Sequence, residues 1–275
     1  MRKFVVVGLA MLGVFAVVGI AYASNTYTST SKVTPSKAGT SAKPTPVAAS
    51  LTFTVGETTG ARPSPLKTYG IGLGGGVVPN TNVAKGCNSS QANAQVLPAI
   101  CLKKATKGGA NVGGGSVNAL AGPTNDTTSP AAKLACFLTV TLVNSTKKNH
   151  MWIRIDGVTS GPPGKTCVTA QHSSIDSTFT KTGTVPKKGG GSLPVWAIKF
   201  TVPPALLHPI GGFDVAVVGN VSNVLKVSKK IGKVTHGYLE TVGCPKTPAG
   251  KRSAATTFTS EAGQTLTSIA SSPCS

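Results

Sequence analysis

Residues 134–155 read LACFLTVTLVNSTKKNHMWIRI, and this stretch decides the class of fold. Apolar side chains occupy every second position from Leu134 to Leu142, which is the period of a β-strand with one buried face. The lysine-bearing segment 145–150 then reads as a hairpin loop, and the apolar segment 151–155 reads as the returning strand. The stretch therefore predicts an antiparallel pair of strands.

The same alternation recurs on both sides of this hairpin. Further strands are predicted at residues 51–55, 196–202, 213–217, 221–227, 238–242, 254–259 and 265–269. The best helix signal runs from Ser89 to Leu97, with Asn88 or Ser89 as the N-cap and Pro98 as the stop, and residues 203–207 read as one helical turn. Short strands in a chain with 33 Gly and 19 Pro predict an all-β fold, an antiparallel β-sandwich with one short helix.

The first 23 residues have the pattern of a secretory signal peptide. Arg2 and Lys3 precede an apolar run, and Ala21-Tyr22-Ala23 supplies a cleavage site. An uncleaved membrane anchor is the alternative, because about 18 apolar residues approach the lower limit for a bilayer span. Residues 24–50 are rich in Ser, Thr, Pro and Lys and are expected to form a disordered linker. Residues 51–275 are expected to be one β-sandwich domain, in which the Gly-rich segment 106–130 forms either a loop between two sheets or a weak edge.

Six cysteines follow the signal peptide, an even number that indicates disulfides in a secreted chain. The sequence leaves the pairing open, but near neighbours are favoured because short loops close most readily. The expected pairs are Cys87–Cys101, Cys136–Cys167 and Cys244–Cys274. Neither a C-x-x-C nor an H-x-x-x-H spacing occurs, so no metal site is predicted.

The chain carries 27 Lys and Arg against 7 Asp and Glu, a net charge of +20. Most of these cations are lysine, a hydrated point charge, whereas arginine supplies the planar fork used in bidentate phosphate recognition. The composition therefore suits diffuse attraction to an anionic cell-wall polymer, polysaccharide or membrane surface, and not specific nucleic-acid binding. Solubility alone is the alternative explanation of the charge. The candidate polyanion-binding residues are Lys103, Lys104, Lys107, Lys147, Lys148, Lys187, Lys188, Lys229, Lys230, Lys233, Lys251 and Arg252.

Catalytic signals are weak. No G-x-S-x-G elbow occurs, and seven carboxylates are a small supply for a glycosidase pair, so no catalytic residue or cofactor is predicted. The sequence favours a non-enzymatic protein, with two alternatives. A carbohydrate-binding module would use exposed rings from Trp152 and Trp196, with Tyr27, Tyr69 and Tyr238 behind them. An extracellular hydrolase would need a carboxylate pair or a Ser–His contact in a cleft.

Several short segments share their spacing with a known group of proteins. They are Pro63-Ser64-Pro65-Leu66, Lys85-Gly86-Cys87, the stretch ending at Cys101, Val112-Gly113-Gly114-Gly115-Ser116, and residues 237–245 and 257–260. These segments resemble secreted proteins of unknown function from actinobacteria. The resemblance implies a secreted, β-rich domain with paired cysteines over most of residues 51–275, and it carries over no functional residue. The expectation is a secreted, non-enzymatic cell-envelope or extracellular protein whose oligomeric state is open.

Overall fold

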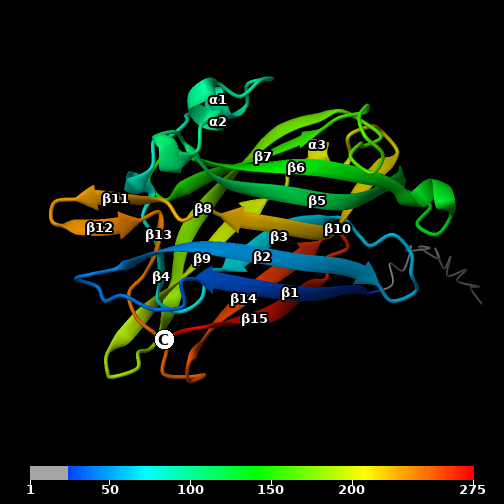
Figure 1. Cartoon of the computed structure of the whole chain (residues 1–275). Helices are drawn as coiled ribbons and strands as arrows, with labels where there is room; N and C mark the ends of the chain where they lie inside the picture. The colour runs from blue at the N-terminus through cyan, green and yellow to red at the C-terminus, as the bar shows by residue number, and fades with distance from the viewer. Residues whose placement is uncertain (1–23) are drawn as a thin grey trace, which may run out of the picture.

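The computed structural model describes residues 24–275, so the predicted signal peptide lies outside the described residues. The chain is built mainly from β-strands (Figure 1). In order they are β1 (Asn25–Thr34), β2 (Thr45–Glu57), β3 (Leu66–Gly72), β4 (Val77–Pro79), β5 (Asn111–Pro123), β6 (Leu134–Asn144), β7 (His150–Gly157), β8 (Gln171–Pro186), β9 (Ser192–Thr201), β10 (Phe213–Val224), β11 (Ser228–Ile231), β12 (Val234–Gly237), β13 (Leu239–Thr241), β14 (Lys251–Ser260) and β15 (Thr265–Pro273).

The helices are single turns that connect or cover the strands. They are η1 (Thr81–Val83), α1 (Ser89–Ala92), α2 (Ala99–Leu102), η2 (Ala105–Lys107), η3 (Pro130–Lys133) and α3 (Pro204–Leu207). Within residues 24–275, no helix has the length and hydropathy needed to cross a membrane.

One 13-stranded sheet dominates the fold. Its order is β15-β14-β3-β9-β8-β7-β6-β5-β10-β2-β13-β4, with β1 paired to β2, while β11 and β12 form a separate hairpin. The paired strands are antiparallel, including the predicted hairpin of β6 and β7, in which Val140 faces Ile155. The prediction of an antiparallel all-β fold is confirmed.

The sheet curves until its first and last strands lie side by side. The backbone N–H of Asn25 in β1 donates to Gln264 beside β15 at 2.9 Å, and Ser29 in β1 donates to Ser268 in β15 at 2.8 Å. Both pairs are 239 residues apart, so the two strands run parallel. The inner faces of the curved sheet then meet in one core, which includes Val33, Leu138, Ile153 and Ile198 from four different strands.

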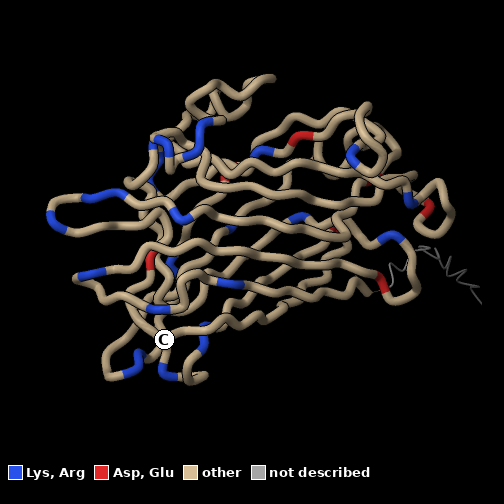
Figure 2. The backbone as a smooth tube through the Cα atoms, viewed as in Figure 1, with Lys and Arg blue, Asp and Glu red and all other residues tan. Residues whose placement is uncertain are grey.

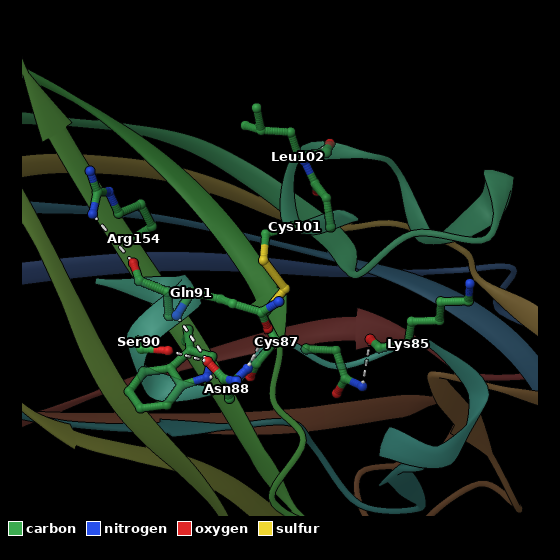
Figure 3. Close-up of a disulfide and its surroundings, with 12 residues drawn as sticks. Lys85, Cys87, Asn88, Ser90, Gln91, Cys101, Leu102 and Arg154 are labelled. Carbon is green, nitrogen blue, oxygen red and sulfur yellow. Dashed lines mark hydrogen bonds between the residues drawn. A yellow bond between two sulfur atoms is a disulfide. The ribbon is translucent and has the colours of Figure 1, made fainter. Parts of the chain in front are cut away.

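A second, smaller core lies under α1 and α2 on the outer face (Figure 3). Asn88 caps α1 by accepting from the backbone N–H of Gln91 at 2.9 Å, as the sequence predicts. The helix ends at Ala92, earlier than the expected Leu97. Arg154 donates to the carbonyls of Ala92 and Gln95. In a helix that continued to Leu97, the Ala92 carbonyl would instead accept from the backbone N–H of Val96.

The expected linker 24–50 is wrong, because it contains β1 and the first part of β2. In β1 the outward residues are four threonines and Lys32, and the inward residues include Tyr27, Ser29 and Ser31. Ser29 contacts Ser268 of the last strand, β15. Small inward serines hide the apolar alternation that would mark a buried strand. The folded domain therefore begins near Asn25, ahead of the expected residue 51.

The expected loop or weak edge at 106–130 is also wrong over its centre, where β5 lies between β6 and β10. Its glycines permit close approach of the neighbouring strands. A Cβ atom on Gly115 would lie only 1.8 Å from the carbonyl oxygen of Val221, so no larger residue fits there without a shift of the backbone.

The three predicted disulfides are confirmed: Cys87–Cys101, Cys136–Cys167 and Cys244–Cys274. Cys87–Cys101 fastens the α1–α2 segment, and Cys244–Cys274 fastens the C-terminus. No cysteine among the described residues is free. Three disulfides suit an oxidising environment outside the cytoplasm.

Candidate functional site: a lysine-rich end of the sheet

Lysines from separate parts of the sequence gather at one end of the sheet. In an antiparallel sheet, alternate connections lie at the same end, and here the lysines lie in the segments that follow β1, β4, β6, β8, β10 and β13, together with the start of β14. Figure 2 shows the concentration of cations on the left of the molecule. We define this lysine-rich end by Lys37, Lys43, Lys85, Lys103, Lys104, Lys107, Lys147, Lys148, Lys187, Lys188, Lys226, Lys229, Lys230, Lys233, Lys246 and Lys251.

Every lysine of the predicted polyanion-binding set lies at this end. All of these side chains are exposed apart from Lys187, which is half-buried. Lys229 and Lys230 lie on β11 and Lys233 lies in the β11–β12 turn, so this trio projects on a hairpin separate from the main sheet (Figure 1).

Few carboxylates neutralise the lysine-rich end. Glu240 is buried beside His236, with its Oε2 atom 3.1 Å from the Nδ1 atom of the histidine. Asp176 binds Lys147 at 3.2 Å and His150 at 2.7 Å. The remaining carboxylates among residues 24–275 lie toward the opposite end, at Glu57, Asp126, Asp156, Asp214 and Glu261. Positive and negative charge are therefore separated along the strands.

The described arginines are structural and do not join this surface. Arg252, the one arginine of the predicted set, is 1% exposed and donates to the carbonyls of Ser36 and Pro273. Its burial lowers the pKa of the guanidinium. Arg62 binds Asp214 at 3.4 Å, and Arg154 binds Asp156 at 2.8 Å. The exposed charge is thus carried by lysine, which favours an extended anionic partner over a shaped phosphate pocket.

The histidines form carboxylate pairs instead of catalytic contacts. His208 lies between two acids, with Nδ1 3.0 Å from Asp214 and Nε2 2.9 Å from Glu261. Partial burial lowers the pKa of His208, but its hydrogen bonds and charge interactions with these acids outweigh burial, so its pKa is raised. Among residues 24–275 no histidine nitrogen bonds a serine or threonine hydroxyl, and no cluster of metal-ligating side chains occurs.

The aromatic side chains expected for sugar stacking point into the protein. Trp152 is 4% exposed and donates to the carbonyl of Cys87 at 2.9 Å. Tyr69 and Tyr238 are buried, Tyr27 stacks on Phe258, and Trp196 packs against the main core. These five residues therefore form no exposed aromatic platform.

A hydroxyl-lined groove, which sequence reasoning missed, crosses the outer face of β8, β9, β3 and β14. Its volume is about 1180 Å³, and its floor carries small or hydroxyl-bearing residues at alternate positions. Thr259, Thr68 and Thr201 form one row across three strands, and Thr257, Gly70 and Lys199 form the next. The alternating threonines of the sequence STFTKT at 177–182 are the signal that could have indicated this surface.

A second feature missed from the sequence is a cavity of about 170 Å³ inside the curved sheet. Its walls are mainly apolar side chains of the core, such as Leu138, Val140, Ile153 and Ile198. Protein interiors are otherwise close-packed, so a space of this size is a distinct feature of the fold.

Comparisons of the chain with protein-family models, with curated proteins and with solved structures find no match.

Proposed function

We propose that this is a secreted, non-enzymatic protein of the cell envelope or extracellular space that binds an anionic polymer through its lysine-rich end. The observation that carries the proposal is the gathering of lysines from separate connections at one end, where the few carboxylates are buried or already paired. The three disulfides support a place outside the cytoplasm.

The mechanism is electrostatic adhesion. Each exposed lysine contributes little by itself, but a polymer that spans several connections engages many at once. Salt screens such contacts over about 10 Å at 0.1 M ionic strength, so binding should weaken steeply as NaCl is added. An anionic wall polymer, acidic polysaccharide or anionic membrane surface would satisfy this chemistry, and no base-specific nucleic-acid contact is required.

The test is co-sedimentation of the disulfide-intact protein with isolated bacterial cell walls across a NaCl series. Walls stripped of their anionic polymers serve as the control. We expect binding to intact walls at low salt, loss of binding at high salt, and none to stripped walls. Salt-insensitive binding, or equal binding to stripped walls, would overturn the proposal.

A matched pair of variants separates the lysine-rich end from net charge. Replacing Lys229, Lys230 and Lys233 by Gln removes three charges from the separate β11–β12 hairpin. Replacing Lys67, Lys133 and Lys165 by Gln removes three charges from the opposite end. We expect the first triple variant to bind walls more weakly than the second. If both triple variants lost wall binding equally, the net charge of the protein would decide binding and the position of the lysines would not.

The hydroxyl-lined groove favours a second candidate function, carbohydrate binding without aromatic stacking. The hydroxyls of Thr68, Thr178, Thr180 and Thr201 make no hydrogen bond with other described residues, and a hydroxyl both donates and accepts, as sugar hydroxyls do. Titration with soluble linear glucan and chitin oligosaccharides at high salt tests this candidate. Thr257→Trp should block the groove, whereas Thr54→Trp on the exposed face of β2 should not.

A further inference from the structure

The geometry points to a binding site for a small, neutral amphiphile in the cavity inside the curved sheet. The ligand would have an apolar body and one uncharged polar group, such as a hydroxyl. This site is separate from the lysine-rich end, so it does not depend on the proposed polymer binding.

The space inside the curved sheet suits a small apolar molecule in size and chemistry. The cavity of about 170 Å³ is close in size to the engineered apolar cavity of ~150 Å³ that binds benzene. Several side chains on the inner face, including Leu51, Ile71 and Phe200, are only partly buried although they point inward. They line space that no other side chain fills, so an apolar molecule there would gain contacts the empty fold lacks.

One wall of the cavity carries a small polar patch. The strand pairings put Ser31, Leu51 and Ser222 in one row across β1, β2 and β10, and Asn220 lies beside Phe53 in the neighbouring row. Asn220 is 8% exposed, and its amide nitrogen donates to Ser222 at 2.9 Å. The Asn220 carbonyl oxygen and the Ser31 hydroxyl have no partner among the described residues, which leaves them able to bind a ligand hydroxyl.

The wall also excludes charged ligands. Among the described residues that line the cavity, Lys32 is the only charged one, and its side chain is exposed on the outer face of β1. A carboxylate inside would lose its hydration without gaining a cation, which is costly. A pocket that is apolar with a few convergent polar groups and no charge selects a neutral amphiphile.

The experiment titrates the intact protein with benzene, 1-hexanol and hexanoate at pH 7.5, followed by NMR chemical shifts and melting temperature. We expect benzene and 1-hexanol to bind in the cavity and raise the melting temperature, with hexanoate weaker by at least about a hundredfold. If neither neutral probe binds, or if hexanoate binds as well as 1-hexanol, the inference is overturned.

Variants assign the site. Val140→Phe should fill the cavity and abolish binding of both neutral probes, whereas Val221→Phe, on the exposed face of β10, should not. Val217→Leu adds one methylene, and it supplies the same test if the larger change prevents folding. Asn220→Leu should weaken the binding of 1-hexanol by about fivefold while sparing that of benzene, because it removes the carbonyl oxygen that would accept from the ligand hydroxyl. Unchanged binding to the filled variants would contradict the assignment.

Discussion

Ser29 and Ser268 join the first strand to the last, with the hydroxyl of Ser29 donating to that of Ser268 at 2.8 Å. This contact lies on the seam where the curved sheet meets itself. Backbone groups of the flanking segments add to it, because Ser275 donates to the carbonyl of Ser36 at 3.2 Å. The seam is held by these isolated bonds, whereas β1 is paired to β2 along its whole length.

A disulfide across this seam should stabilise the fold. The paired change Ser29→Cys and Ser268→Cys places two sulfurs where the hydroxyls already touch. Because the cross-link would close a loop of 239 residues, we expect the free energy of unfolding to rise by about 3–5 kcal/mol. Denaturant unfolding without reductant measures it, and each single variant serves as a control. Mass spectrometry shows whether the double variant carries four disulfides. If it does and its free energy of unfolding does not rise, the close packing of the seam is contradicted.

His208 should make stability depend on pH. Its pKa is raised in the folded protein by Glu261 and Asp214 despite partial burial, and Arg62 also binds Asp214. A histidine whose pKa is raised by folding stabilises the protein fully at pH values below its pKa in the unfolded chain, which is about 6.5. That stabilisation is lost as the pH rises through the pKa of the histidine in the folded protein. His208→Asn should therefore destabilise the protein more at pH 5 than at pH 8.5.

The pH effect of His208 is checked by denaturant unfolding of both proteins at the two pH values. In a Glu261→Gln background the difference between the two pH values should shrink, because one of the two acids that raise the pKa is gone. If His208→Asn destabilised the protein more at pH 8.5 than at pH 5, the predicted direction of the pH dependence would be wrong.

Asn144 should be among the costliest polar residues to replace. It is 1% exposed at the end of β6, and its amide nitrogen lies 2.9 Å from the carbonyl oxygen of Thr81, 3.2 Å from that of Ala84 and 3.1 Å from that of Lys85. Asn144→Ala leaves these carbonyls without a donor, so we expect a loss of about 2–3 kcal/mol in unfolding free energy. The exposed Asn223 gives the matched control, Asn223→Ala, with little change. Similar effects from both would contradict the anchoring role.

Gly115 should tolerate no side chain. Gly115→Ala would place a Cβ atom against the carbonyl oxygen of Val221, forcing β5 and β10 apart. We expect a loss of about 1–3 kcal/mol, measured by chemical denaturation. Gly211→Ala is the control, since a Cβ atom there meets nothing within 4 Å. A neutral Gly115→Ala would mean that the two strands are free to separate locally.

The sequence by itself determined the features that depend on local order. Alternation from Leu134 to Leu142 and the following lysine-bearing turn specify the β6–β7 hairpin, because a strand's inward and outward faces follow directly from a period of two. Near-neighbour pairing also predicted the three disulfides, since short loops close readily.

Only the tertiary structure decided what depends on contacts between distant segments. β1 and β5 are strands because long-range partners cover the serines of one and the glycines of the other, and neither pattern shows apolar alternation. The lysines share one end because the order of strands in the sheet brings alternate connections together, which composition cannot reveal. The groove and the cavity likewise exist only where strands far apart in sequence face each other, because such spaces are set by packing and not by any local pattern.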